Sequence, residues 1–328
     1  MTATQPGTRK SRRRDRAMVP EATFTSYYGR PIVKASPWTA DIPAYLFLGG
    51  LAGASSLLAA GADLAGNTAL RRPTRVTALV AILGSLAALV HDLGRPARFH
   101  HMLRVAKVTS PMSVGTWILT AYGPMAGLAA VAEAGRLLPR AVADGPVGRA
   151  LPGAGRAAGA VAALLGPAVA SYTAVLLSDT ATPAWHDGRR DLPFVFVGSA
   201  AAAAGGMAML ATPTAHAGAA RRMAVGGAVL DLAMSARMES AMGLSAEPMR
   251  EGRAGTYRSA ARVLTAGGAA LAAVAGRRSR AGSALAGAAL LAGSACTRFG
   301  IFHAGQQSAR DPRYTVVAQR RRREAREE

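Results

Sequence analysis

Residues 91–117 read HDLGRPARFHHMLRVAKVTSPMSVGTW, a polar segment between two apolar runs. The segment holds three of the six histidines and one of the three tryptophans. The flanking runs, VTALVAILGSLAALV (76–90) and SVGTWILTAYGPMAGLAAVAE (113–133), are nearly free of charge. Apolar runs of about 20 residues are long enough to cross a bilayer as helices, so they would hold the segment between them at one membrane surface. The question is whether this segment is only a loop or the rim of a site.

The composition favours a membrane protein over a nucleic-acid-binding one. Half of the residues are hydrophobic, and 39 Lys and Arg against 18 Asp and Glu give a net charge of +21. Such a charge is typical of proteins that bind nucleic acid and of cytoplasmic loops beside membrane helices. The charges cluster between apolar runs, and only 5% of residues are aromatic, which is few for stacking on bases. We therefore expect a lipid bilayer, and no nucleic acid, as the surroundings of this chain.

The apolar runs predict an all-α integral membrane fold with eight transmembrane helices. The expected spans cover residues 40–64, 74–93, 113–135, 157–178, 192–212, 216–238, 259–276 and 281–303. The sixth is the weakest because it contains Arg221, Arg222 and Asp231. The expected domains are a basic cytoplasmic tail (1–34), an eight-helix membrane domain (35–305) and a basic cytoplasmic C-terminal tail (306–328). Gly49 and Gly53 lie four residues apart, a spacing that lets helix backbones approach closely in lipid.

Eight spans place both ends of the chain on one side of the membrane. That side collects 27 Lys and Arg, against 12 on the other. Basic residues accumulate in the cytoplasm, so the count predicts cytoplasmic termini in the plasma membrane. Without the two tails the numbers become 11 and 12, so the orientation depends mainly on the tails. Ser11-Arg12-Arg13-Arg14 is superficially similar to an export signal, but no apolar core follows it at the usual distance.

The polar segments that contain motif-like residues all fall on the side of the termini. The segments of the other side, such as 136–156, are rich in Ala, Gly and Arg. This asymmetry predicts a partner-docking surface above a pocket between helices. The candidate catalytic residues are His91 and Asp92, and the candidate quinone-binding residues are Asp41, Tyr45, Arg95, Ser113, Thr116, Trp117, Tyr122 and Asp179, with Tyr172 as a further pocket candidate.

A His–Asp pair at the end of a helix bundle could hydrogen bond to a quinone carbonyl and relay protons, because histidine titrates near neutrality and a carboxylate can orient it. The alternative is that His91, Asp92 and Arg95 form an ion-pair cluster at the level of the lipid headgroups. Residues 99–107, including His100 and His101, are more consistent with docking surface than with a site.

The residue inventory argues against metal cofactors inside this chain. Cys296 is the only cysteine, so a cysteine-ligated iron–sulfur cluster is not expected. The histidines fall at span ends or in connections, which argues against paired haem ligands at membrane depth. Glu133, Asp231 and Glu239 could belong to a proton path, but pairing with arginines such as Arg222 or Arg237 is the simpler interpretation.

Four segments of the chain resemble those of a known family. The segments DIPAYLFLGG (41–50), DLGRP (92–96), SPMSVGTW (110–117) and the stretch from Arg298 to Tyr314 are similar to those of the NrfD/PsrC family, the membrane subunits of polysulfide-reductase-like molybdoenzyme complexes. The similarity extends over about residues 26–320. It implies eight helices in two four-helix bundles and a quinone site beneath a docked ferredoxin-like iron–sulfur subunit, which exchanges electrons with a molybdopterin catalytic subunit. It also implies that the chain itself carries no haem.

The resemblance implies a function that the residues alone do not fix. Residues Asp41, Tyr45, His91, Asp92 and Tyr122 match the region of the family's quinone contacts. The first hypothesis is a quinone-reactive anchor, using menaquinone or another quinone, in a molybdopterin/iron–sulfur oxidoreductase of possible formate-dehydrogenase type. The second is a passive scaffold, which is favoured if Tyr45, Asp92 and Tyr122 share no cavity. A transporter would need polar residues that continue to the other side.

Overall fold

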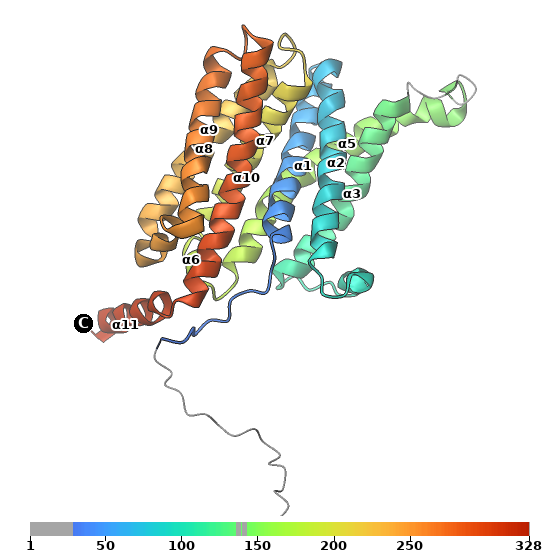
Figure 1. The fold of residues 1–328 in the computed structure, drawn as a ribbon. Helices are drawn as coiled ribbons and strands as arrows, with labels where there is room; N and C mark the ends of the chain where they lie inside the picture. The colour runs from blue at the N-terminus through green and yellow to red at the C-terminus, as the bar shows by residue number, and fades with distance from the viewer. Residues whose placement is uncertain (1–28, 136–138, 140–142, 328) are drawn as a thin grey trace, which may run out of the picture.

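The computed structural model describes residues 29–135, 139 and 143–327, and this part of the chain is helical without a β-strand (Figure 1). The predicted basic tail of residues 1–34 lies mostly outside these residues. The described part contains eight helices of 20 residues or more: α1 (Asp41–Leu64), α2 (Thr68–His91), α3 (Pro111–Ala134), α5 (Pro146–Ser178), α7 (Leu192–Ala211), α8 (Gly218–Ala241), α9 (Gly252–Val274) and α10 (Arg280–Arg310).

Six of these helices are long and apolar enough to cross a membrane, namely α1, α2, α3, α5, α7 and α10. In α8 and α9, charged side chains interrupt the apolar sequence, including Arg221 and Arg222 in α8 and Arg258 and Arg262 in α9. The chain is therefore a multi-pass helical membrane protein, as the sequence predicts.

The helices begin where the sequence supplies a suitable first residue. The Asn67 side chain accepts a hydrogen bond from the backbone of Leu70 at 3.1 Å and caps α2. Ser279 caps α10 in the same way, through the backbone of Gly282. Proline occupies the first turn of α3, α5 and α7, where its missing N–H costs no helical hydrogen bond. Gly66, at a φ of 67°, makes the tight turn between α1 and α2.

The long helices form two groups of four. The first group is α1, α2, α3 and α5, the second is α7, α8, α9 and α10, and α1 and α5 pack against α7 to join them. Within and between the groups, glycines allow backbones to touch. A Cβ placed on Gly53 would lie 2.3 Å from the carbonyl oxygen of Gly166, and one on Gly206 would lie 2.8 Å from that of Gly287. The small-residue packing predicted at Gly53 is therefore present between α1 and α5.

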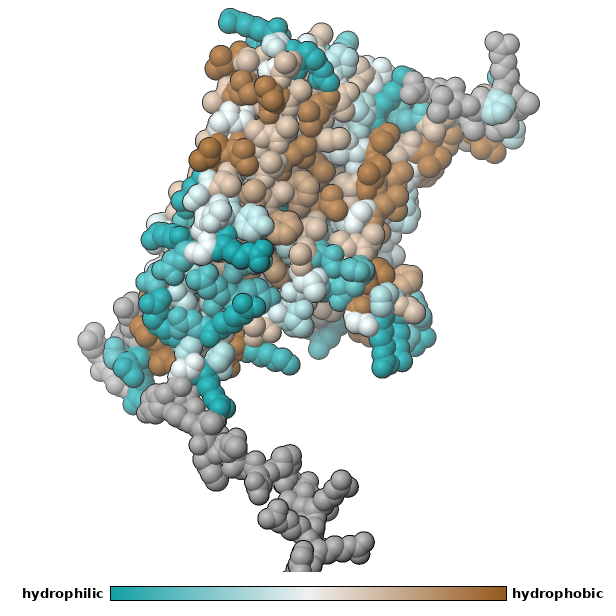
Figure 2. Space-filling view, viewed as in Figure 1, coloured by the Kyte–Doolittle hydropathy of each residue, from teal (hydrophilic) through white to brown (hydrophobic). Residues whose placement is uncertain are grey.

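Short helices connect the long ones at one end of the molecule. They are η1 (Pro96–Arg104), α6 (Pro183–Asp187) and η3 (Gly243–Met249), and α11 (Arg313–Glu327) follows α10 at the same end (Figure 1). We call this end the terminal face, formed by residues 36–41, 91–111, 178–192, 241–253 and 303–320, and the opposite end the far face, formed by residues 64–68, 143–146, 211–218 and 274–280. Figure 2 shows apolar side chains along the helices, and hydrophilic ones gathered at the terminal face and over the lower part of the second group.

Four helix boundaries differ by six residues or more from those predicted, the first being α2, which begins at Thr68 instead of residue 74. Helix α5 begins at Pro146 instead of residue 157, because arginines and glycines made its first turns look like a connection. Helix α9 begins at Gly252 instead of residue 259. Helix α10 continues to Arg310, and residues Arg313–Glu327, predicted as tail, are helical. Arg313 fixes the start of α11 by donating to Glu247 of η3 at 2.6 Å.

Candidate functional site

The start of α1 and the end of α2 meet at the terminal face and bring an acid and a base together. Asp41 lies in the first turn of α1 and His91 in the last turn of α2, positions where the helix dipoles favour these charges. His91 Nδ1 lies 2.8 Å from Asp41 Oδ2. A carboxylate can only accept, so Nδ1 carries the proton and Nε2 is left for another partner. The His91 side chain is 80% exposed, so this nitrogen is accessible from the terminal face.

Thr39 links this pair to Asp92. Its hydroxyl lies 2.7 Å from Asp92 Oδ1 and 3.0 Å from Asp41 Oδ2, and its backbone N–H donates to Asp92 Oδ1 at 3.0 Å. Thr39, Asp41, His91 and Asp92 thus form one hydrogen-bonded group, the Asp41–His91 cluster. The prediction that His91 pairs with Asp92 is wrong, because His91 pairs with Asp41 instead. Asp92 follows the last residue of α2, and its carboxylate turns to Thr39 while His91 reaches Asp41.

Ser113 and Trp117 hold the connection before α3 in place. Ser113 Oγ donates to the carbonyl of Val105 at 2.8 Å and accepts from the backbone of Lys107 at 3.0 Å. Trp117 Nε1 donates to the same carbonyl at 3.2 Å, while Thr116 bonds within its own helix. The structure thus gives Ser113 and Trp117 a positioning role, which keeps residues 105–113 folded over the start of α3.

The predicted tyrosines lie deeper in the first group of helices and are not brought together with Asp92. Tyr122 is fully buried, and its hydroxyl is 2.7 Å from Ser56 Oγ. Tyr45 is 3% exposed, and its backbone carbonyl accepts from Ser85. Tyr172, in the last turns of α5, is 8% exposed, and its buried hydroxyl has no hydrogen-bond partner in the structure. Its ring packs on the backbone of Gly115, where a Cβ would lie 2.2 Å from a ring carbon.

The two remaining candidates lie away from the cluster. Arg95 is exposed and precedes η1. Asp179 follows the end of α5 and lines a cavity of about 350 Å³ together with Asp187 and Tyr314. Burial raises the pKa of the Tyr314 hydroxyl further above neutral pH, and this hydroxyl donates to Glu247 at 3.5 Å.

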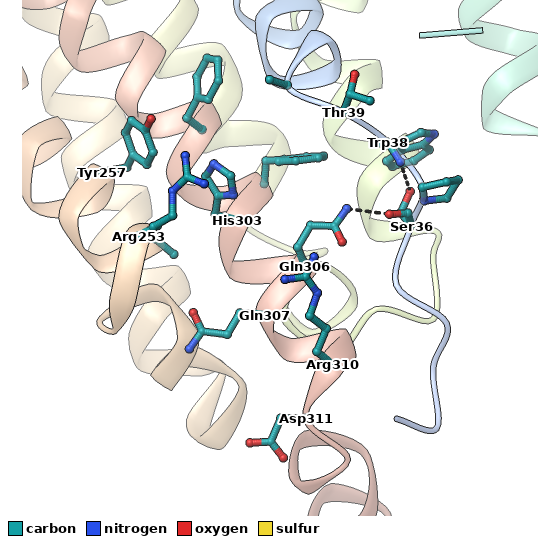
Figure 3. A pocket seen from close by; sticks show the side chains of 15 residues that line it. Ser36, Trp38, Thr39, Arg253, Tyr257, His303, Gln306, Gln307, Arg310 and Asp311 are labelled. Carbon is teal, nitrogen blue, oxygen red and sulfur yellow. Dashed lines mark hydrogen bonds between the residues drawn. The ribbon is translucent and has the colours of Figure 1, made fainter. Parts of the chain in front are cut away.

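The largest cavity described lies elsewhere on the terminal face, between the segment before α1, α9 and α10. Its volume is about 910 Å³, and Figure 3 shows Trp38, Tyr257, His303 and Gln306 around it. None of the five cavities described contains Tyr45, Asp92 or Tyr122 in its lining. Sequence reasoning missed Thr39, Trp38 and Tyr257. The available signal was on α10, where Phe299, Phe302, His303 and Gln306 recur at helical spacing.

Glu133 and Glu239 pair with arginines, as the simpler interpretation expected, but with arginines other than Arg222 and Arg237. For Asp231 the expectation is wrong, since no arginine of the described residues lies within ion-pair distance of it. Glu133 pairs with Arg71 at 2.7 Å and Arg75 at 2.8 Å, near the far face. Glu239 pairs with Arg258 at 2.9 Å and with Arg262. Asp231 accepts from Ser235 at 3.3 Å and Thr297 at 3.5 Å.

These features define a class: a polytopic helical membrane subunit whose hydrogen-bonding residues gather at one face. The chain belongs to the NrfD family, since the sequence model described as "Polysulphide reductase, NrfD" matches residues 32–245, which include the whole Asp41–His91 cluster. The family points to a membrane subunit of a quinone-interacting oxidoreductase complex, which in general has catalytic and iron–sulfur partners. A comparison with curated proteins found no match.

Proposed function

We propose that this chain is the quinone-reactive membrane subunit of a molybdopterin/iron–sulfur oxidoreductase, with a ferredoxin-like subunit docked on its terminal face. In this proposal all eight long helices cross the plasma membrane and both termini are cytoplasmic. The quinone is menaquinone or another membrane quinone, and the catalytic partner is of formate-dehydrogenase type. The observation that carries the proposal is the Asp41–His91 cluster, an accessible imidazole held by a carboxylate where a partner would dock.

The hydrogen-bonding side chains at the terminal face fit a quinone. A quinone takes up two electrons and two protons when it becomes a quinol, and its carbonyl oxygens accept hydrogen bonds. The iron–sulfur partner would supply or receive the electrons, since the chain contains a single cysteine and no cysteine-ligated cluster can be built from it. The Tyr172 hydroxyl is a second fitting group, because a buried donor without a partner is costly unless a ligand or water completes it.

His91 would handle the protons. With Nδ1 held by Asp41, its Nε2 can donate a hydrogen bond when protonated and accept one when neutral. Asp41 fixes the orientation of the imidazole ring through the hydrogen bond to Nδ1. Thr39 holds Asp41 and Asp92 at fixed positions, so the cluster remains ordered when the charge on His91 changes.

The test uses the complete complex with its partner subunits. We expect His91→Ala and Asp41→Asn to lower quinone-coupled turnover about a hundredfold, because a positioned acid–base group contributes on the order of 10² to 10⁴ in rate. Turnover of the soluble subunits with an artificial dye should not change. His100→Ala is the matched control, since His100 is exposed on the same face and no carboxylate among the described residues lies within ion-pair distance of it.

A passive scaffold is the second candidate, and one observation favours it: Tyr45, Asp92 and Tyr122 share none of the five cavities described. A scaffold predicts that both cluster variants keep the full quinone-coupled rate. That result would remove the assignment of His91 and Asp41 and leave the docking function.

A further inference from the structure

The cavity of about 910 Å³ contains only Thr39 of the Asp41–His91 cluster in its lining, and Asp41, His91 and Asp92 do not line it. Residues 36–40 form one side of it, and α9 and α10 form the others (Figure 3). Most of its side chains come from residues 253–257 and 299–311, which lie outside the segment matched by the family, residues 32–245.

The inner part of the cavity is aromatic. The Tyr257 ring stacks on the His303 ring, with centroids 5.5 Å apart and an interplanar angle of 13°, and it lies 5.7 Å from the Phe299 ring. Phe302 lies behind them against the fully buried Trp185, which also stacks on Trp38 at 5.8 Å. These ring contacts form the inner, apolar wall of the cavity.

The outer part of the cavity is cationic. Arg253 near the start of α9 and Arg310 at the end of α10 are both exposed and line the same space (Figure 3). Neither is within ion-pair distance of a carboxylate in the described part of the chain. Asp311, the one acid in the lining, lies 3.8 Å from Arg313 and accepts from its backbone N–H at 2.8 Å, so a neighbouring cation already offsets its charge.

The two parts follow one another along α10. At a rise of about 1.5 Å per residue, Phe299 lies roughly 16 Å further into the helix bundle than Arg310. Cys296 and Ala292 continue the same helical face beyond Phe299 and are partly or fully exposed. A ligand in this cavity would therefore meet cations at the terminal face, aromatic rings below them and an apolar helix surface further in.

This order of contacts matches an anionic amphiphile. A neutral quinone ring requires no pair of guanidinium groups, whereas a lipid phosphate is well matched by arginines at the membrane surface. An acidic peptide would use the arginines but not the apolar path at membrane depth. We propose that this cavity binds an anionic phospholipid, with its phosphate between Arg253 and Arg310 and its glycerol and first acyl carbons over Tyr257 and Phe299.

Lipid retention by the full-length chain tests the proposal. The chain, purified in detergent, is incubated with dioctanoyl phosphatidylglycerol, dioctanoyl phosphatidylcholine or inorganic phosphate, and bound species are measured by native mass spectrometry. We expect phosphatidylglycerol to bind and the other two to bind at least tenfold more weakly. Arg253→Gln/Arg310→Gln should weaken the phosphatidylglycerol complex roughly thirtyfold, because each surface arginine contributes attraction of about fivefold.

Two further variants keep the test decisive. Arg98→Gln/Arg104→Gln removes the same charge from exposed positions of η1 on the same face and should leave lipid binding unchanged. Tyr257→Ala should weaken lipid binding while the arginines remain. Equal retention by wild type and the Arg253/Arg310 variant would overturn the proposal. Equal binding of inorganic phosphate and phosphatidylglycerol would also overturn it.

Discussion

Glu133 shows how this chain keeps a carboxylate inside an apolar helix. Its side chain is 8% exposed, and Arg71 and Arg75 hold it from α2, while the same arginines also reach Asp63 of α1 at 2.7 and 3.3 Å. One network thus links α1, α2 and α3 near the far face. Each charge is compensated, so the network acts as a structural joint and needs no ligand to be stable.

Removing one partner of this joint should be costly. We expect Glu133→Gln to lower the free energy of unfolding in detergent by about 3 kcal/mol, because it leaves the guanidinium groups of Arg71 and Arg75 with Asp63 as their only shared counter-charge. Arg156→Gln is the control: Arg156 is 76% exposed and 3.8 Å from Asp63, so its loss should cost less than about 1 kcal/mol. Denaturant titration followed by circular dichroism measures both. Equal costs would show that the network does not carry stability.

The sequence predicted the residues of the Asp41–His91 cluster better than their contacts. Asp41, His91 and Asp92 are the expected residues, but adjacency along the chain suggested the wrong pair. Successive residues at a helix end point in directions about 100° apart, so His91 and Asp92 reach different partners on the segment around α1. Thr39 carries no motif, and only the antiparallel packing of α1 and α2 brings it to Asp92. The contacts of Tyr45, Tyr122 and Tyr172 could not be predicted from the sequence, because they depend on how deep in the helix bundle each residue lies.

At the scale of elements, the contact between Gly53 of α1 and Gly166 of α5 fixes how closely the first four helices approach. A Cβ on either glycine would lie 2.3 to 2.4 Å from the carbonyl oxygen of the other, and this distance is too short for any side chain. In lipid, such backbone approach is a main source of helix association, because apolar burial adds little.

Gly53→Ala should therefore separate α1 from α5 and destabilise the protein by about 1–3 kcal/mol, as overpacking does in other cores. Gly61→Ala is a matched control in the same helix, since a Cβ there would meet nothing within 4 Å. The control should be neutral or slightly stabilising, because alanine favours helix. Thermal unfolding of both variants in one detergent decides the matter. Similar melting of the two would argue against a close α1–α5 contact.

The apolar runs predicted where the eight long helices lie, because an apolar run in lipid can satisfy its backbone only as a helix, but only six of the eight are apolar enough to cross a membrane. The runs could not place the polar ends of the helices. Helix α5 starts at Pro146, eleven residues earlier than predicted. The backbone hydrogen bonds of the helix continue through this charged segment, which the composition did not indicate. The short helices η1, α6 and η3 fall outside the apolar runs, and they pack against α3 or α10.

For the whole molecule, the two faces use their arginines differently. At the far face, Arg280 donates to the carbonyls of Met209 and Thr212, and Arg221 donates to those of Thr214 and Gly276. Arg71 and Arg75 are held by Glu133. Many of the 12 basic residues on that side are thus bound within the bundle. The terminal face keeps exposed, unpaired arginines such as Arg253 and Arg310, as a cytoplasmic surface facing anionic lipid would.

This difference supports a cytoplasmic terminal face even where the loop counts, 11 against 12, do not decide. Two single-cysteine variants in a Cys296→Ser background test it: Ala65→Cys in the exposed α1–α2 turn of the far face, and His100→Cys in exposed η1. A membrane-impermeant maleimide should label residue 65 in intact cells and residue 100 only after permeabilisation. The opposite pattern would place the terminal face outside, and the proposed iron–sulfur partner with it. Labelling of both in intact cells would mean that an even number of helices spans the membrane between them, so that α2, the one long helix between them, would not cross.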